Sequence, residues 1–340
     1  MFLDFIKCLN RCRIHRKEKE FTDMVLNGYK SPSYLKIEEK GDEYPGKIVY
    51  LIKEFGYYNG FFSELLFLLK KLIFCDAHGF VPFVDWGSNL LYFEPEGVDG
   101  EKNAFLHYYN RVSEVEDASK ASLVVTADDP HLDWVYEKYG CYAYQYPEEY
   151  MDALSNMAKK YVSLNNRLRS EFSKLFEEMT GNKKTLAVHF RGTDYRREYN
   201  RHPKFITVEE EIEKVNELIE EKGYEKVFLA TDEVDAINKF KDAFGDKLIY
   251  FDDVRRSENG DESVAFTKTD KPGEKYRLGY EVVRDQYFLT ECDGLVCGIS
   301  NITIAARILK KAWCDKPYDD LVVIDHGFNE NDNRFANAGH

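Results

Sequence analysis

Three short apolar segments of this sequence each end in polar side chains of the kinds that bind anions or move protons. Residues 184–190 lead into His189, Arg191 and Asp194. An arginine presents a planar, permanently charged group that pairs with two oxygens of a phosphate or a carboxylate. A carboxylate beside it either pairs with that arginine in solvent or helps to organise a ligand site, and this segment alone does not decide between the two.

Two later segments have similar polar ends. Residues 226–231 are followed by Asp232, and residues 293–298 are followed by Ser300 and Asn301 at the expected start of a helix. Free backbone amides at a helix start form a seat for a phosphate, although simple capping by Ser300 or Asn301 explains the same residues. The carboxyl ends of parallel strands lie at one edge of a sheet, so we expect these side chains to converge.

The chain around these segments alternates strands with helices. From residue 184 onward we expect strands at 184–190, 226–231, 247–252, 293–298 and 321–325, with helices at 207–222, 233–244, 275–291 and 302–313. Thr207 and Glu210 have the spacing of a capping box, which predicts where one helix begins. Continuous apolar strands are typical of parallel sheets that are covered on both faces.

An earlier series has the same alternation. We expect a strand from residue 47 to Gly56, a largely apolar helix over residues 61–78, and strands at 80–86 and 121–126. Gly56, Asn59 and Gly60 would let backbone amides approach a ligand at the start of that helix, but a plain tight turn fits equally well. A helical stretch at 147–179, with a break near 163–166, is expected to bridge the two series.

The two series predict the α/β class, with two Rossmann-like, doubly wound domains that face a central cleft. We place an N-terminal segment and polar linker at 1–45, with the linker at 31–45. The first domain is expected at 46–180 and the second at 181–328. Residues 329–340 form a polar tail that we expect to be disordered.

The overall composition narrows the class of protein. The formal net charge of the 340 residues is −14, whereas surfaces that bind nucleic acid are basic, so we expect no nucleic-acid partner. Seven cysteines form no metal-binding spacing and are expected to be mostly reduced core thiols of a cytoplasmic protein. No apolar run reaches the length of a membrane span. The basic amphipathic residues 1–17 either dock on the protein itself or make a peripheral contact with the inner face of a membrane.

Three motifs together resemble one fucosyltransferase superfamily. They are His189-Phe-Arg-Gly-Thr-Asp194, the Ala-Thr-Asp that ends at Asp232, and Asp285 ahead of the Val-Cys-Gly-Ile-Ser that ends at Ser300. The superfamily includes the α1,6-fucosyltransferases that act on N-glycan cores and the rhizobial nodulation fucosyltransferases. The order and rough spacing of the motifs hold over about residues 184–312, and the glycine loop at 56–64 is a weaker match.

The resemblance implies a GT-B architecture, in which the first domain faces the acceptor and the second holds GDP-fucose. It implies these roles for single residues: guanine recognition by His189 and Asp285, a diphosphate clamp by Arg191, and donor-site positions for Asp194, Asp232 and Ser300. The implied reaction is an inverting transfer of L-fucose to a glycan hydroxyl. Because the chain has no Asp-x-Asp motif, we expect no metal and no other cofactor.

Two departures from the family pattern affect the acceptor side. Gly192 stands where the eukaryotic core enzymes carry a second arginine, and Tyr195 stands where they carry a lysine. Glu198 lies near the region of the family's proposed base, so it is our candidate for accepting the acceptor's proton. The alternative for Glu198 is a surface ion pair with a neighbouring arginine.

Two questions stay open at this point. The charged, glycine-containing loop at 253–274 is either a lid over the donor site or a disordered connection. The chain is also compatible with a transferase of the same fold that uses another nucleotide sugar, or with a catalytically silent glycan-binding protein.

Overall fold

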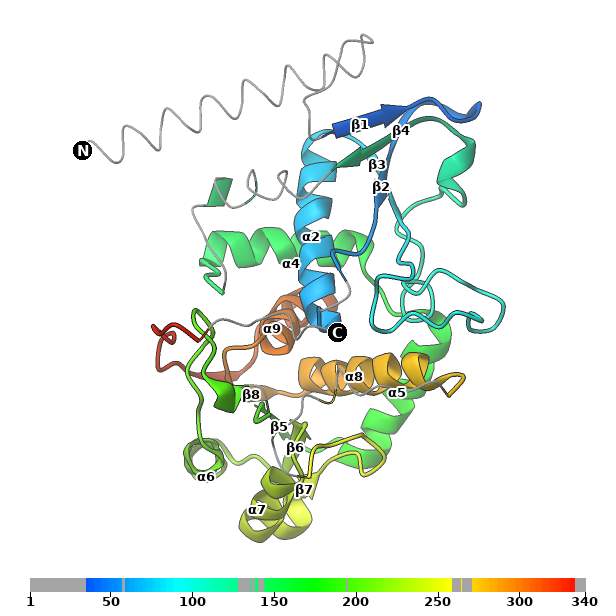
Figure 1. Cartoon of the computed structure of the whole chain (residues 1–340). Coiled ribbons are helices and arrows are strands. Elements are labelled where there is room, and N and C mark those ends of the chain that lie inside the picture. Colours follow the sequence, from blue (N-terminus) through cyan, green and yellow to red (C-terminus); the bar gives the residue numbers. More distant parts are fainter. Residues whose placement is uncertain are drawn as a thin grey trace, which may run out of the picture.

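The structure is a computed structural model that describes residues 35–56, 59–127, 135, 138–139, 144–193, 195–258, 264 and 271–333. Two β-sheets lie toward opposite ends of the molecule, and a group of helices that includes α2, α4, α8 and α9 lies between them (Figure 1). The expected α/β class is confirmed. The N-terminal residues 1–17, for which a membrane contact was considered, lie outside the described residues.

The first sheet contains four strands in the order β1-β4-β2-β3. They are β1 (Leu35–Glu38), β2 (Glu43–Ile52), β3 (Val81–Val84) and β4 (Ala121–Ala127). Strand β2 runs parallel to β3 and β4, whereas β1 pairs antiparallel with β4. Helix α2 (Phe61–Ala77) connects β2 to β3 and shares one apolar core with Tyr50 of β2. Val49 belongs to a separate cluster with residues 115–121, which include the short 3-10 helix η1 (Ala118–Lys120). A loop with one 3-10 turn, rather than an α-helix, therefore packs on that face of the sheet.

The second sheet contains five parallel strands in the order β7-β6-β5-β8-β9. They are β5 (Thr185–Phe190), β6 (Lys226–Thr231), β7 (Leu248–Ile249), β8 (Gly294–Gly298) and β9 (Asp320–Ile324). The chain moves outward from β5 through β6 to β7 and then returns to the other side of β5. The strand order therefore reverses between β5 and β8, and ligands of open α/β sheets bind beyond the strand ends at such a reversal.

The remaining helices cover the second sheet and join it to the first. They are α4 (Glu148–Tyr161), α5 (Asn166–Thr180), α6 (Val208–Lys222), α7 (Val234–Phe244), α8 (Glu274–Glu291) and α9 (Asn301–Cys314), with 3-10 turns η2 (Tyr195–Arg197) and η3 (Gly245–Lys247). Helix α9 packs against α2, α4 and α8. The expected break in the long helical stretch is confirmed, because Asn165 accepts a hydrogen bond from the Leu168 N–H and starts α5.

A glycine on α8 lets the two parts of the chain approach closely. A Cβ atom at Gly279 would lie 2.1 Å from the Tyr108 hydroxyl oxygen. That hydroxyl donates a hydrogen bond of 3.0 Å to the Tyr276 carbonyl, and the rings of Tyr108 and Tyr276 stack with centroids 5.6 Å apart. The loop after β3 is thus held against the start of α8.

Two predictions about polar segments are wrong where the structure describes them. Residues 31–45 were expected to be a linker, but they contain β1 and the start of β2. Strand β1 is an edge strand whose Lys36 and Glu38 side chains are exposed, and edge strands tolerate such charges. Residues 329–340 were expected to be disordered, but residues 329–333 form hydrogen bonds with residues 197–202.

One expected strand is much shorter than its apolar run. The prediction was 247–252, but β7 contains only Leu248 and Ile249. Phe251 leaves the sheet and packs on Phe288 of α8, with ring centroids 4.7 Å apart. The buried contact with α8 therefore takes the place of further strand pairing.

The structure describes several of the cysteines and the helices that could be tested as membrane spans. Cys75, Cys292 and Cys297 are buried free thiols, and burial raises the pKa of each. Within the described residues, no helix combines the length and the apolar content needed to cross a bilayer.

Glu211 of α6 gives a prediction about stability. Its carboxyl group is fully buried, and neither oxygen has a hydrogen-bond partner among the described residues. Burial raises its pKa well above 4.5, so the folded protein keeps a proton that the unfolded chain releases above about pH 4.5. The free energy of unfolding therefore falls as the pH rises above that value. We expect Glu211→Leu to increase the free energy of unfolding at pH 7 by about 1–3 kcal/mol.

Urea unfolding between pH 4 and pH 8 measures this effect, with Glu213→Leu on the exposed face of α6 as the control. The gain from Glu211→Leu should grow with pH, whereas Glu213→Leu should change the free energy of unfolding little at any pH. A gain that is the same at pH 4 and pH 8 would contradict a buried, proton-holding carboxyl group.

Candidate functional site

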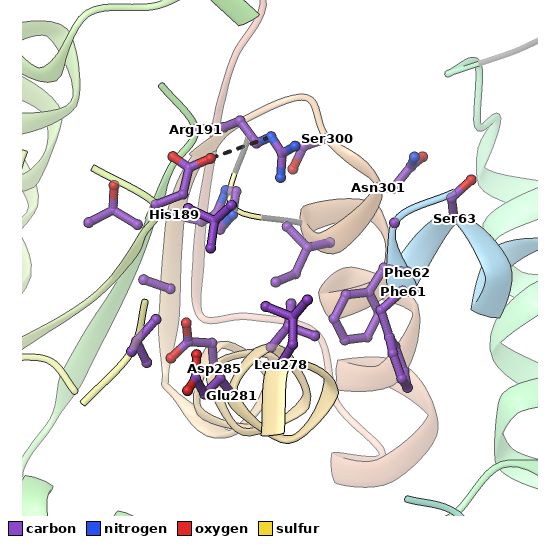
Figure 2. A pocket seen from close by; sticks show the side chains of 18 of the residues that line it. Phe61, Phe62, Ser63, His189, Arg191, Leu278, Glu281, Asp285, Ser300 and Asn301 are labelled. Atoms are coloured by element: carbon purple, nitrogen blue, oxygen red, sulfur yellow. Dashed lines mark ion pairs between the residues drawn. The ribbon is translucent and has the colours of Figure 1, made fainter. Parts of the chain in front are cut away.

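A cavity of about 370 Å³ lies beyond the carboxyl ends of β5 and β6. The residues that line it come from the start of α2, the ends of β5 and β6, the middle of α8 and the start of α9. Its volume is within the range of pockets that hold small molecules, about 300–1,000 Å³. In Figure 2, Arg191 and Ser300 lie toward one end of the cavity, and Asp285 and Glu281 lie toward the other.

The first end of the cavity is suited to an anion. Arg191 follows β5, and its side chain is about one-third exposed (33%), so it is accessible from the cavity. The starts of α2 and α9 line the same cavity, and the amide groups at a helix start carry partial positive charge. The N-cap residue of α2 is Gly60, which has no side chain, and the Phe61 N–H donates instead to the Tyr92 hydroxyl at 3.1 Å. A cation and two helix starts therefore converge on one region.

Asp232 holds the turn that carries Arg191. One carboxylate oxygen of Asp232 accepts from the Gly192 N–H at 3.1 Å, and the other accepts from the Thr193 hydroxyl at 2.8 Å. The Arg191 Nε atom lies 3.9 Å from the second oxygen, which is a long ion pair. The carboxylate at the end of β6 thus fixes the direction in which the chain leaves β5.

Gly192 is required by the carboxylate of Glu233, which the sequence analysis did not single out. A Cβ atom at position 192 would lie 1.9 Å from Oε1 of Glu233. That buried carboxylate accepts two hydrogen bonds from Arg196, at 3.0 and 2.8 Å. Glycine at position 192 therefore has a steric reason, because a larger side chain would collide with Glu233 while it is paired with Arg196.

We expect Gly192→Ala to reduce the free energy of unfolding by about 1–3 kcal/mol, because the new methyl group displaces the Glu233 carboxylate. Thermal or urea unfolding measures the loss. The matched control is Gly192→Ala combined with Glu233→Ala, in which the space is open. If the double variant is less stable than Glu233→Ala by the full cost of the single Gly192→Ala change, the steric explanation is wrong.

The glycine loop ahead of α2 is organised by Glu64. Its buried carboxylate accepts from the N–H groups of Phe55 and Gly56, at 2.7 and 3.0 Å, and from the Asn59 amide at 3.0 Å. Asn59 and Gly60 line the cavity, but Gly56 is not among its lining residues. The structure therefore places two of the three loop residues at the site, while Gly56 serves to close the loop.

The second end of the cavity is formed by carboxylates of α8. Asp285 is almost fully buried, and burial raises its pKa to about 7 although Arg284 and Arg256 act in the opposite direction. Glu281 lies one helical turn earlier and accepts from the Arg255 N–H at 3.1 Å and from Arg277 at 2.9 Å. Between the two ends, burial and the charge of Arg191 lower the pKa of His189 to about 3, so its imidazole is neutral.

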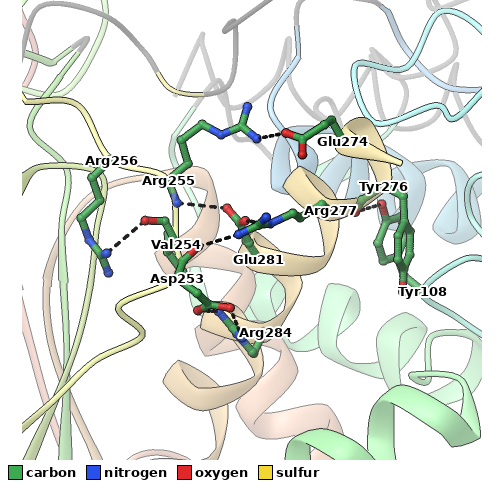
Figure 3. Close-up of polar contacts among 10 residues, drawn as sticks. All are labelled: Tyr108, Asp253, Val254, Arg255, Arg256, Glu274, Tyr276, Arg277, Glu281 and Arg284. Atoms are coloured by element: carbon green, nitrogen blue, oxygen red, sulfur yellow. Dashed lines mark hydrogen bonds and ion pairs between the residues drawn. The ribbon is translucent and has the colours of Figure 1, made fainter. Parts of the chain in front are cut away.

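A network of arginines ties the segment after β7 to α8 (Figure 3). Arg284 donates to both oxygens of Asp253, and its guanidinium lies 3.8 Å from the centroid of the Phe251 ring. Arg255 pairs with Glu274 at 2.6 Å. Residues 253–256 are therefore anchored beside the carboxylates of the cavity. Most of the rest of the predicted lid or disordered loop, 259–263 and 265–270, lies outside the described residues.

Known proteins similar to this chain are found among solved structures alone. No family model and no curated protein matches the chain. Similar solved structures are fucosyltransferases. NodZ alpha-1,6-fucosyltransferase soaked with GDP-fucose has 16% identity and a TM-score of 0.44, and the match covers 77% of this chain and 92% of that chain. POFUT1 in complex with GDP has 10% identity and a TM-score of 0.44, covering 83% of this chain and 99% of that chain. NodZ from Bradyrhizobium, with 16% identity and a TM-score of 0.43, is matched over 77% of this chain and 92% of that chain.

Most of the predicted site residues come together at the cavity. Those that line it are Asn59, Gly60, His189, Arg191, Asp232, Asp285, Ser300 and Asn301. The Ser300 side chain accepts from the Thr303 N–H and forms a capping box with Thr303, so it acts as the helix cap that was the alternative for this residue. Asp194 lies outside the described residues.

Glu198 is exposed and is not among the cavity's lining residues. Its backbone lies in the left-handed region, with φ of 49°, and its carbonyl accepts from the Asn331 amide at 2.8 Å. The alternative for Glu198 was a surface ion pair with Arg196, Arg197 or Arg201, and of these Arg196 pairs with Glu233 instead. The structure thus brings Glu198 to residues 329–333 rather than to the cavity.

Sequence reasoning missed several residues that line the cavity. These are Tyr92, Tyr144, His202, Arg255 and Glu281. Glu281 had a usable signal, because it lies four residues before Asp285 on an expected helix and therefore on the same face. The others come from loops, where sequence spacing does not indicate direction. Among the described residues, no group of three or more His, Cys, Asp or Glu side chains is arranged to hold a metal ion.

Proposed function

We propose that this protein is an inverting glycosyltransferase that moves L-fucose from GDP-fucose to a glycan hydroxyl without a metal ion. The observation that carries the proposal is the division of the cavity. One end has Arg191 and two helix starts, and the other has the carboxylates of Asp285 and Glu281. The choice of fucose rests on the three sequence motifs around Arg191, Asp232 and Asp285.

The carboxylate end favours guanine over other bases. Guanine presents two adjacent donors on its pairing edge, the N1–H and the exocyclic N2–H₂, and a carboxylate accepts from both. Uracil presents one N–H between two carbonyl oxygens, which a pair of carboxylates would repel. The neutral imidazole of His189, between the two ends, adds a donor and an acceptor without adding charge. A guanine nucleotide therefore matches the cavity better than a uridine nucleotide.

The anion end provides what the leaving group needs. In an inverting transfer, the acceptor oxygen attacks C1 of fucose from the face opposite the diphosphate. The bond between C1 and the phosphate oxygen breaks, and GDP leaves with the electron pair. Negative charge grows on the diphosphate in the transition state, where Arg191 and the helix starts stabilise it more than in the ground state. In a transfer without a metal ion, Arg191 and the helix starts are the groups that neutralise the negative charge of the departing diphosphate.

The acceptor hydroxyl must also lose its proton. Glu198, the sequence-based candidate for the base, is exposed and outside the cavity lining. His202 lines the cavity and belongs to the same segment. Within the proposal, the proton passes to a ring nitrogen of this imidazole.

A donor screen tests the proposal. The protein is incubated with GDP-fucose, GDP-mannose, UDP-galactose or dTDP-rhamnose in buffer with EDTA, together with a panel of oligosaccharides. Release of the nucleoside diphosphate is measured, and binding of GDP, UDP and dTDP is measured by calorimetry. We expect GDP to bind and GDP-fucose to be consumed. Absence of both would refute the proposal, and preference for UDP or dTDP would favour another nucleotide sugar. GDP-fucose turnover that requires added Mg²⁺ or Mn²⁺ would refute only its metal-independent part.

Binding of GDP is expected to depend on pH through Asp285. Its pKa of about 7 in the ligand-free protein means that it holds a proton below that pH, and a protonated carboxyl group cannot accept from both guanine donors. Deprotonation precedes binding, so affinity should rise with pH up to about 8. Between pH 8 and pH 6 the dissociation constant should increase about tenfold. Calorimetric titration with GDP at each pH measures this profile. The GDP phosphates also titrate in this range, and the pH profile of Asp285→Asn, which has no carboxyl group at position 285, shows their contribution alone.

A further inference from the structure

A second hollow lies next to the donor cavity. Its lining residues Gln145 and Arg201 are chain neighbours of Tyr144 and His202, which line the cavity. The hollow has a volume of about 930 Å³, is open to solvent, and is lined by Gln145, Asn200, Arg201, Phe328, Glu330 and Asp332 among others. These residues come from the segment before α4, the segment after η2 and the C-terminal segment. None of them was a candidate in the sequence analysis.

The wall of the hollow is built by pairing of residues 197–204 with residues 327–333. Backbone hydrogen bonds join Asn200 to Asn333 at 2.7 Å, Arg201 and His202 to Asn329 at 2.9 Å each, and Lys204 to Gly327 at 2.9 Å. Because main-chain groups on both segments are satisfied by each other, the two segments form one ordered wall.

Three alternate asparagines strengthen this wall. The side-chain amides of Asn329, Asn331 and Asn333 donate to the carbonyls of Tyr199, Glu198 and Arg197, at 3.4, 2.8 and 2.6 Å. Residues 331 and 332 form a bend, so this segment is held by side-chain as well as backbone hydrogen bonds rather than as a regular strand. The asparagine side chains therefore help to hold the two segments together, and Asn329 and Asn331 line the hollow along with the exposed Glu330 and Asp332.

Aromatic rings connect the hollow to the donor cavity. The Tyr144 ring lies 6.1 Å from the His202 ring and 6.2 Å from the Phe328 ring, measured between centroids. Tyr144 and His202 line the donor cavity, whereas Phe328 lines the hollow. A ligand that extends from the hollow along these rings would reach the cavity beside His202.

The chemistry of the hollow fits a neutral or weakly charged sugar chain. Its side chains combine amides, carboxylates and one guanidinium, which together donate to and accept from hydroxyl groups. The charges are of both signs, since Arg201 stands with Glu330 and Asp332, so the hollow is not a basic track for a polyanion. Phe328 offers an aromatic surface for the apolar face of a sugar ring.

We propose that this hollow is the acceptor subsite, which holds an uncharged oligosaccharide so that its terminal sugar enters the donor cavity between Tyr144 and His202. The inference rests on the proposed glycosyltransferase function. It predicts that residues 327–333 determine the affinity for the acceptor and leave the affinity for the donor nucleotide unchanged.

The test uses the full chain saturated with GDP and a panel of neutral tetrasaccharides of glucose, galactose, mannose or N-acetylglucosamine. Binding is measured by saturation-transfer NMR and titration for the wild type, Gln145→Ala/Asp332→Ala and Phe328→Leu. The control is Asp242→Ala, an exposed residue of α7. We expect at least one tetrasaccharide to bind, at least tenfold weaker binding by both hollow variants, and unchanged GDP affinity in all proteins.

The possible outcomes separate the two proposals. If GDP fails to bind but the hollow variants lose the tetrasaccharide, the GDP-fucose proposal fails and the hollow still stands as the oligosaccharide-binding site. If GDP binds and no tetrasaccharide does, or if binding is equal in the wild type and the hollow variants, the subsite is refuted. Binding of an unstructured Gly-Ser-Thr decapeptide in place of every sugar would also refute it, in favour of a polypeptide acceptor. Phe328→Leu keeps an apolar side chain, so its loss of binding would report on the ring rather than on folding.

Discussion

Replacing Arg191 by alanine is expected to lower kcat/KM for GDP-fucose by roughly 10³-fold, the size of effect seen when a charge-stabilising group is removed from a transferase site. The reason is positional. Arg191 is the cavity's charged group at the carboxyl end of the central strand β5, and it stands beside the starts of α2 and α9. Initial rates of GDP release and the affinity for GDP measure the effect. Most of the loss should appear in kcat, because the charge of the diphosphate grows in the transition state.

Two further variants show whether the arginine acts through its shape as well as its charge. Arg191→Lys keeps the charge but not the planar fork, so it should recover only part of the lost activity. Arg169→Ala removes an exposed arginine of α5 that lines neither the cavity nor the hollow, and it should retain wild-type rates. The Arg191 pair with Asp232 is long and partly exposed, so the unfolding temperature of Arg191→Ala should change little. Wild-type turnover by Arg191→Ala would assign the cavity to another chemistry.

The convergence of this site could be predicted from sequence because it depends on backbone rules. Apolar runs before Arg191 and Asp232 indicate buried parallel strands, and the carboxyl ends of such strands share one edge of the sheet. The structure adds the strand order, in which β5 and β8 are neighbours although more than one hundred residues separate them. That pairing places Arg191 beside the start of α9.

The direction of loop residues could not be predicted in the same way. Glu198 and His202 lie on one short segment, and only His202 lines the cavity. The difference arises from the left-handed backbone of Glu198 and from the contacts of this segment with Asn331. Such contacts join residues more than one hundred positions apart, and nothing in the local sequence signals them.

Polar composition was also a poor guide where main-chain hydrogen bonds determine structure. Strand β1 and residues 329–333 have the side chains of a linker and of a tail. Both are ordered because their backbone groups pair with β4 and with residues 197–202, respectively. The exposed side chains of β1 remain polar because they face solvent. In residues 329–333 the asparagine side chains add hydrogen bonds to those of the backbone.

Asparagine at position 285 is expected to weaken GDP binding by roughly 10–100-fold, the discrimination that a good two-point contact to a base edge provides. The substitution keeps the shape of the side chain but replaces one acceptor oxygen by an NH₂ group. That group faces a guanine donor and leaves it without a partner inside a buried site, which is costly. The measurement is calorimetric titration with GDP at pH 8, where the wild-type carboxylate is ionised.

Inosine diphosphate makes this second test specific, since it lacks the exocyclic amine of guanine and keeps the N1–H. The wild type should bind inosine diphosphate more weakly than GDP, and Asp285→Asn should bind both nucleotides with similar affinity. Asp252→Asn, which changes an exposed carboxylate after β7, is the matched control and should bind GDP as the wild type does. If Asp285→Asn loses affinity equally for both nucleotides, Asp285 shapes the cavity through its neighbours Arg284 and Arg256 instead. A cavity that distinguishes the two nucleotides through Asp285 would establish that its buried carboxylate reads the amine of the base.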